Sequence, residues 1–369
     1  MRLAAIMTVC GPVTPEELGF TSMHEHILSD CSMFGTRSRK PYFVPPFQRI
    51  RPGDRLALAN RSAVRHDIVS SLDNMRLDDE AVMLAEVAAF KAGGGNSIVE
   101  TSAPGIRAGD ADLIALTGIA RKSGVHIIAS TGLYAEDTWP AQYRTMTQAQ
   151  YVRFLQQEIQ QGIGGSGILP GHIKAAYEAP SPQVDAYLRA AAFVSGSTGV
   201  SLQVHLGPDV TADAVRSEVV APLLAGGCIP GKTILCHVQY LLGVLSLDCL
   251  INQPGQVPFN LGLLEELLAQ GFVLSFTPLG FEADNELLGL AHYPDWYALA
   301  GMAALIRQGY AGQLVAGNDV FTKLATLHGG GDGYRRLTDF IVPALRQCGI
   351  IPADVEKIFF ENPARILAF

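Results

Sequence analysis

Short apolar runs alternate with segments of helical periodicity over most of the chain, from about residue 79 to residue 319. Short apolar runs bounded by glycine indicate buried strands, whereas apolar positions recurring every three to four residues indicate helices that bury one face. The pattern predicts strands at residues 21–27, 97–100, 126–130, 172–176, 201–205, 233–237, 272–276 and 314–319. It predicts helices at residues 79–91, 110–122, 148–161, 182–197, 212–224, 261–269 and 296–308.

Glycines at the ends of the predicted helices support the same alternation. Gly124, Gly199, Gly227 and Gly271 each stand between a helix and the next strand, where helices commonly end in a left-handed residue. Eight strands that alternate with helices predict a single α/β domain over residues 1–369, a (β/α)8 TIM barrel with long loops on its C-terminal face. A doubly wound open sheet is the alternative, but it normally has a glycine-rich phosphate loop after the first strand, and the sequence has none there.

Composition and charge indicate which binding partners the protein can have and in which cellular compartment it is expected. The chain is 48% hydrophobic and 17% charged, with a formal net charge of −8 and no long basic cluster, which argues against a nucleic-acid partner. No apolar run is long enough to span a membrane, and the N-terminus does not resemble a secretory signal. The six cysteines form no C-x-x-C pair and are expected to be reduced thiols. We therefore expect a cytoplasmic protein that acts on a small molecule and has no membrane partner. Apolar helix faces such as residues 296–306 are compatible with a homodimer.

The first predicted strand contains His24-Glu25-His26. Because side chains alternate across a strand, the two imidazoles are expected on one face, about 7 Å apart, with Glu25 on the other. This spacing lets both rings bind one metal ion, although such pairs occur more often without a metal. Glu25 is expected to have a structural role.

Polar residues also end several later strands. Lys174 belongs to the fourth strand, His205 ends the fifth, His237 the sixth and Asp319 the eighth. Each has a simpler explanation, since the histidines can be core residues bonded to the backbone and Asp319 can cap a helix. A lysine in an apolar strand is harder to explain, because a buried ammonium ion is costly unless it is paired or deprotonated. Since barrel strands converge at their C-terminal ends, the set predicts an active site there.

The ordered set of motifs resembles the phosphotriesterase-related branch of the amidohydrolase superfamily. The resemblance covers nearly the whole chain, through Thr8-Val-Cys-Gly11-Pro12, Gly19-Phe-Thr21, His24-Glu-His26, Gly132, Lys174, Val204-His205, Cys236-His237, Asn318-Asp319 and Glu361-Asn362-Pro363-Ala364-Arg365. It implies a binuclear metal site in which His24, His26 and Asp319 hold the more buried ion, and His205 and His237 the exposed one. It further implies that Lys174, carboxylated by CO2 to a carbamate, bridges the two ions together with a hydroxide.

The chemistry that follows from the resemblance is hydrolysis. Two divalent ions lower the pKa of a shared water, and Asp319 is expected to take its proton during attack on an ester, lactone, phosphoester or N-acyl amide. Zinc suits imidazole ligands, whereas Mn, Co or Fe are also compatible with carboxylate-type ligands. A ligand-binding protein of the same fold with little turnover is the alternative. A mononuclear deaminase of the superfamily is disfavoured, because it lacks the lysine found here at position 174.

Substrate contacts are less well defined by the sequence. Tyr134 follows the third strand, where lactone-hydrolysing relatives carry a tyrosine beside the metals, so it is a candidate substrate contact. Those relatives also carry an Asp-Arg pair after the seventh strand, and Pro278 at the arginine position weakens the lactonase assignment. Residues 28–76, here called the cover loop, are expected to cover the mouth. Cations that could bind an anionic substrate tail are Lys323, Arg37, Arg39 and Arg49.

Overall fold

The computed structural model describes residues 4–36, 50–107, 109–243, 251–253, 255–256, 259–281 and 294–369. Its centre is an eight-stranded sheet in which all neighbouring pairs run parallel and follow one another in chain order. The strands are β3 (Thr21–Glu25), β6 (Ser97–Glu100), β7 (His126–Gly132), β8 (His172–Tyr177), β9 (Ser201–Leu206), β10 (Thr233–Cys236), β11 (Val273–Phe276) and β12 (Leu314–Ala316). All eight lie within the predicted apolar runs or extend them by one or two residues.

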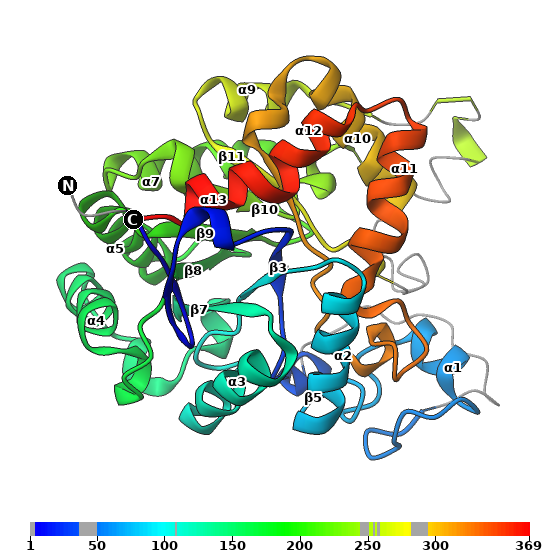
Figure 1. Ribbon diagram of the computed structural model, residues 1–369. Helices are drawn as coiled ribbons and strands as arrows, with labels where there is room; N and C mark the ends of the chain where they lie inside the picture. The colour runs from blue at the N-terminus through cyan, green and yellow to red at the C-terminus, as the bar shows by residue number, and fades with distance from the viewer. Residues whose placement is uncertain are drawn as a thin grey trace.

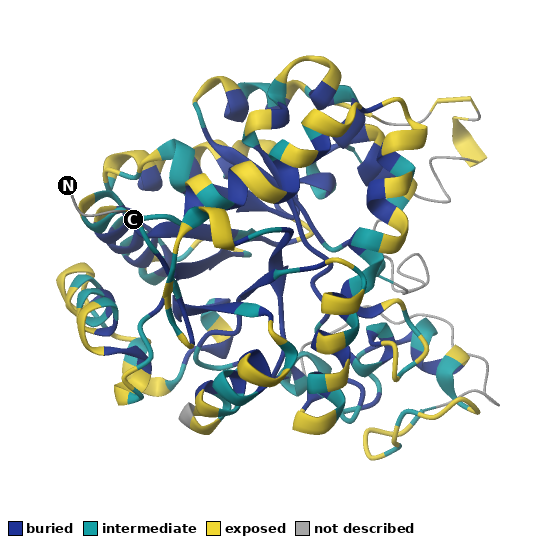
Figure 2. Ribbon diagram, in the orientation of Figure 1, coloured by how far each residue is buried: buried dark blue, intermediate teal, exposed yellow. Residues whose placement is uncertain are grey.

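The last strand returns to the first, so that the sheet curves into a barrel (Figure 1). The Asp319 N–H donates to the His24 carbonyl at 3.0 Å, which joins the segment after β12 to β3. Helices surround the strands, and Figure 2 shows buried strands in the centre with exposed residues on the outer helix faces. This arrangement is the predicted (β/α)8 TIM barrel.

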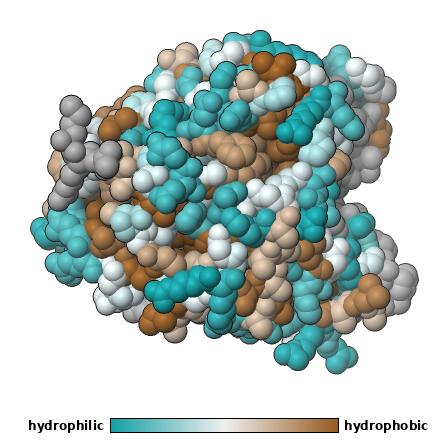
Figure 3. All heavy atoms as spheres, in the orientation of Figure 1, coloured by the Kyte–Doolittle hydropathy of each residue, from teal (hydrophilic) through white to brown (hydrophobic). Residues whose placement is uncertain are grey.

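The helices match the predicted segments closely. They are α2 (Glu80–Ala92), α3 (Asp110–Ser123), α4 (Gln148–Gln161), α5 (Pro182–Thr198), the run of α6 (Ala212–Ala214), η7 (Val215–Val220) and α7 (Ala221–Ala225), then α9 (Gly262–Ala269) and α10 (Asp295–Arg307). Three further helices follow the last barrel strand and were not predicted, α11 (Val342–Gln347), α12 (Pro352–Glu356) and α13 (Asn362–Leu367). Among the described residues, none of these helices is both long and apolar enough to cross a membrane. The face in Figure 3 is mostly hydrophilic, with smaller hydrophobic areas between.

Local sequence explains where the helices begin and end. The hydroxyl of Ser181 accepts a hydrogen bond from the Val184 N–H, and Pro182 occupies the first turn, so α5 begins there. At the other end Gly199 adopts φ 80°, a left-handed conformation that costs glycine little. The carboxylate of Asp79 caps α2 by accepting from two backbone N–H groups.

Two apolar layers hold the barrel together. Buried strand residues, among them Val99, Ile128, Val273 and Val315, form an inner cluster. Ile366 of α13 packs against the same cluster and closes one end of the barrel. A larger cluster fills the space between the strands and the surrounding helices. The predicted site lies at the opposite end of the barrel, where the polar residues gather.

The segments at the edges of the barrel are partly regular. A hairpin of β1 (Ile6–Thr8) and β2 (Gly11–Val13) precedes the barrel, and Ala5 and Phe369 exchange backbone hydrogen bonds. The cover loop contains two short regular elements, β4 (Ser29–Asp30) and α1 (Arg61–His66). β4 pairs with β5 (Arg76–Leu77), where the loop ends. This long-range pairing has no periodic signal in the sequence.

We expect Gly317→Ala to destabilise the protein at the junction between β12 and β3. A Cβ at Gly317 would lie 2.7 Å from the His24 carbonyl oxygen and 2.8 Å from its Cβ, closer than side chains normally approach. Overpacking of this kind costs about 1–3 kcal/mol. Gly312→Ala is the matched control, because a Cβ there meets nothing within 4 Å. Urea unfolding of both variants tests the expectation, and equal stabilities would contradict it.

Candidate active site

The two histidines of the first barrel strand lie on the same side. The Asp319 carboxylate oxygen Oδ1 is 3.6 Å from His24 Nε2 and 3.2 Å from His26 Nε2. The pairing of β3 with β6 is irregular between Ser22 and Glu25, yet the ring centroids are only 5.9 Å apart. His26 Nδ1 is 2.8 Å from the Ser102 hydroxyl, which fixes the ring and directs Nε2 toward the mouth.

Lys174 of β8 is fully buried among these groups. Its Nζ lies 3.3 Å from His24 Nε2 and 5.8 Å from the centre of the Tyr134 ring. Within the described part of the chain, no carboxylate forms an ion pair with it. Burial lowers the pKa of the Lys174 amine, because a charged ammonium ion is poorly solvated there. The charged form of Lys174 is therefore less favourable here than in water.

His205 and His237 come from neighbouring strands. β9 and β10 pair His205 with Cys236, the residue before His237, and the two imidazole centroids lie 4.3 Å apart. His237 Nδ1 donates to the Thr277 carbonyl at 2.6 Å. Its Nε2 therefore carries the lone pair, and that atom is buried without a hydrogen-bond partner among the described residues. Burial lowers the pKa of His237 to about 4, so the ring is neutral at pH 7.

Asp319 follows β12 in a left-handed conformation with φ 55°. The next helical turn begins only after Thr322, so the explanation of Asp319 as a helix cap is wrong. Burial by itself raises the pKa of Asp319, but the hydrogen bond to His26 and the charges of nearby groups outweigh it and lower the pKa. The carboxylate is therefore ionised, and it faces the imidazoles.

The donor set fits a divalent cation. Ligand atoms of His24, His237 and Asp319 all lie within 4.8 Å of one another, and all three residues are buried. His237 Nε2 is a buried nitrogen atom with no hydrogen-bond partner in the described structure. Such atoms are normally satisfied in proteins, and imidazole and carboxylate ligands are those that zinc prefers.

A pocket of about 250 Å³ opens over this cluster. Its wall is mostly apolar, formed by Phe34, Ile68, Val69, Ile106, Phe281 and Phe321. Tyr134 also lines it, with its hydroxyl 3.3 Å from His205 Nε2. Pro278, the residue that weakened the lactonase assignment in the sequence, lines the pocket as well. Tyr134 thus lies beside the predicted ligands, as a substrate contact requires.

Glu178 lies in the same pocket and was missed by the sequence reasoning. It follows β8 directly, and its Oε1 is 3.8 Å from His205 Nε2. Because strand side chains alternate, residue 178 continues the inward face of Lys174. That period of two is the signal that could have identified it.

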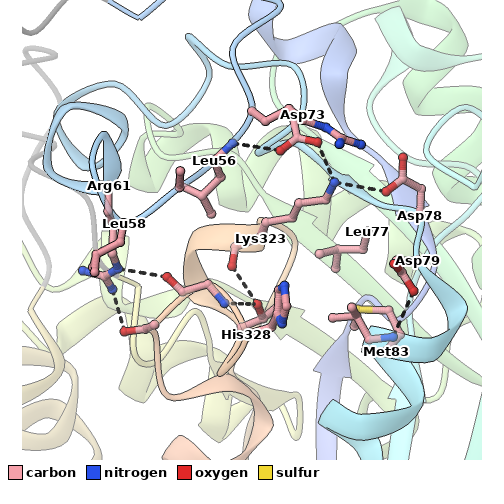
Figure 4. Close-up of a pocket in the computed structure, with 16 residues that line it drawn as sticks. Leu56, Leu58, Arg61, Asp73, Leu77, Asp78, Asp79, Met83, Lys323 and His328 are labelled. Carbon is pink, nitrogen blue, oxygen red and sulfur yellow. Dashed lines mark hydrogen bonds and ion pairs between the residues drawn. The ribbon is translucent and has the colours of Figure 1, made fainter.

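A second pocket of about 500 Å³ lies between the cover loop, α2 and the loop after β12 (Figure 4). Lys323 points into it, and its amine pairs with Asp73 at 2.8 Å and with Asp78 at 3.2 Å. Arg61 donates to the carbonyls of Gly329 and Gly330 on the other side. Lys323 therefore joins two loops and is not among the residues that line the pocket over the histidines. Its contact with a substrate tail stays a prediction. The other candidate cations, Arg37, Arg39 and Arg49, lie outside the described residues.

Comparisons with known proteins identify the family to which the chain belongs. Residues 4–367 match the family model described as Phosphotriesterase family. The chain is 28% identical to an N-acetyltaurine hydrolase of Xenopus tropicalis over 99% of this chain and 98% of that protein. It is 27% identical to a phosphotriesterase-related protein of Nematostella vectensis over the full length of both. A crystal structure of a resiniferatoxin-binding protein from Rhodobacter sphaeroides superposes with a TM-score of 0.83 at 25% identity, covering 98% of this chain and 94% of that one.

The chain belongs to the phosphotriesterase family, as the resemblance in the sequence predicted. The family and the relatives support a hydrolase. The lactonase Lmo2620 from Listeria monocytogenes has the same fold, with a TM-score of 0.73 at 20% identity over 99% of both chains.

Proposed function

We propose that this protein is a metal-dependent hydrolase that acts on an ester, lactone, phosphoester or N-acyl amide. His24, His26 and Asp319 would hold one divalent ion, His205 and His237 a second, and a CO2-derived carbamate on Lys174 would bridge them. Zinc is the metal that this donor set favours, with Mn, Co or Fe as alternatives. When bound, the ions supply Lewis-acid activation of the substrate and lower the pKa of water.

The protein's own side chains would orient the metal ligands, accept a proton and bind the substrate. The His237 Nδ1–H bond to Thr277 and the contact of His26 Nδ1 with Ser102 leave both Nε2 atoms facing the mouth. The Asp319 carboxylate can accept the proton of the attacking water. The Tyr134 hydroxyl can donate a hydrogen bond to an oxygen of the substrate beside His205. The apolar wall excludes bulk water and binds an apolar part of the substrate.

The observation that carries this proposal is the convergence of four imidazoles, an amine and a carboxylate from five different strands. Purified protein loaded with Zn, Mn or Co should hydrolyse at least one member of a panel of lactones, aryl esters, phosphotriesters and N-acyl amino acids. N-acetyltaurine belongs in the panel because a relative is named for its hydrolysis. Chelation should abolish the activity and added metal should restore it. Metal-independent turnover would contradict the proposal.

A ligand-binding protein with little turnover is the second candidate. Two observations favour it: the largely apolar wall of the pocket and the similarity to a protein named for binding resiniferatoxin. Under this candidate, the protein binds an apolar ligand whether or not metal is present. A panel that yields binding by calorimetry but no hydrolysis with any metal would support it.

We expect Tyr134→Phe to reduce the catalytic efficiency about 10-fold or less, because one neutral hydrogen bond contributes about 0.5–1.5 kcal/mol. The variant keeps the ring over Lys174 and removes only the hydroxyl beside His205. The metal content should not change. Tyr143→Phe is a control in the loop before α4, and a loss of metal in Tyr134→Phe would contradict the assignment of Tyr134 as a substrate contact.

A further inference from the structure

Glu25 is a buried carboxylate on the face of β3 opposite the two imidazoles. Among the described residues it forms no ion pair, and its oxygens accept hydrogen bonds instead. Oε1 accepts from the Asn318 backbone N–H at 2.9 Å and from the Asn318 side-chain amide at 2.7 Å. Oε2 accepts from the Val320 N–H at 3.0 Å. The Ser22 hydroxyl also donates to Oε1.

These bonds flank Asp319 on both sides. The N–H groups of residues 318 and 320 bind Glu25, and the N–H of Asp319 between them binds the His24 carbonyl at 3.0 Å. Three successive backbone N–H groups are therefore bound to two adjacent residues of β3. Asp319 itself has φ 55°, a conformation that residues other than glycine adopt only when their surroundings enforce it.

We propose that Glu25 is a positioning residue that holds Asp319 in its left-handed conformation and thereby directs its carboxylate at His24 and His26. The carboxylate suits this role because it offers acceptors on both oxygens and no donor. Tyr334, which donates to the His26 carbonyl at 2.7 Å, braces the same strand from the loop after β12. The inference rests on the proposed function, in which Asp319 is a metal ligand and proton acceptor.

The glutamine variant tests this role with little change in volume. Glu25→Gln replaces one acceptor by an N–H₂ group, which then faces the N–H of residue 318 or 320. We expect metal affinity to fall about 10–100-fold, as is usual when a partner that orients a ligand is lost. We also expect kcat to fall while KM stays within about 2-fold, because the substrate pocket is not touched.

Two controls separate positioning from general stability. Ser22→Ala removes one donor to Glu25 and leaves the bonds to residues 318 and 320 intact. Asn362→Ala removes two buried hydrogen bonds, to the carbonyls of Ala311 and Leu314, at the end of β12 opposite to the one that leads to Asp319. Both should keep the metal affinity and kcat of the wild type, even where the unfolding midpoint falls. Asn318→Ala removes one donor to Glu25 Oε1, so metal affinity and kcat should fall less than in Glu25→Gln. It replaces Glu25→Gln as the test variant if Glu25→Gln does not fold.

The outcomes distinguish this inference from the proposed function. Crystal structures of Glu25→Gln or Asn318→Ala should show Asp319 displaced from His24 and His26 relative to the wild type, whether or not metal is present. If the wild type binds metal and both variants keep its metal affinity, its kcat and the placement of Asp319, the inference is overturned. If the wild type neither binds metal nor hydrolyses any substrate, the proposed function fails, and the displaced Asp319 alone then supports the positioning role.

Discussion

Replacing Lys174 by methionine should remove at least one of the two bound metal ions and lower hydrolysis more than about 100-fold, because a direct ligand contributes more than the 10–100-fold of a residue that orients a ligand. The lysine is fully buried, 3.3 Å from His24 Nε2, at the centre of the proposed ligand set. Methionine has a similar length and no charge, so it fills the space and removes the cost of burying an amine. The measurements are metal content after gel filtration and turnover with added metal.

The stability of this variant distinguishes loss of a ligand from loss of fold. Lys174→Met should unfold at the same urea concentration as the metal-free wild type or at a higher one. Lys323→Met is the matched control, because the same substitution there removes ion pairs with Asp73 and Asp78 in the second pocket. The control should retain its metal and its turnover. Full activity in Lys174→Met would contradict the role of Lys174.

Asp319→Asn should lower kcat about 10²–10⁴-fold, the usual contribution of a positioned general base. Asparagine tolerates the left-handed conformation observed at φ 55° and keeps the backbone bond to His24, so the fold should persist. What the substitution removes is the negative charge that faces His26 at 3.2 Å.

An exposed carboxylate provides the control for this experiment. Asp339→Asn changes the same atoms in a surface ion pair with Arg335, which contributes little to stability. It should leave kcat unchanged. If Asp319→Asn retained kcat within about 2-fold of the wild type, Asp319 could not be the proton acceptor.

Much of the barrel follows from local sequence. The helix at residues 148–161 was predicted with its observed bounds from the spacing of its apolar residues. The contact of the Gln150 side chain with the Thr147 N–H is a second local signal, which the prediction did not use. Period-two alternation likewise placed His24 and His26 on one face and Glu25 on the other, where Glu25 contacts the segment after β12.

What the sequence did not reveal depends on contacts between distant segments. The last strand was predicted to run to Asp319, but β12 ends at Ala316. Residues 318–320 bend away because buried acceptors on β3 bind their N–H groups. Lys323 was expected at the substrate pocket and lies instead between Asp73 and Asp78. These contacts join residues that are far apart in the sequence and that only the folded barrel brings together. The local sequence pattern therefore does not predict them.

The number of metal ions per chain tests the proposed binuclear site most directly. Wild-type protein, purified in the presence of zinc and bicarbonate and then passed over a desalting column, should retain two divalent ions per chain by mass spectrometry of the metals. Lys174→Met should retain none or one. Wild-type protein that retains no metal under these conditions, with its histidine cluster intact in a crystal structure, would contradict the central claim.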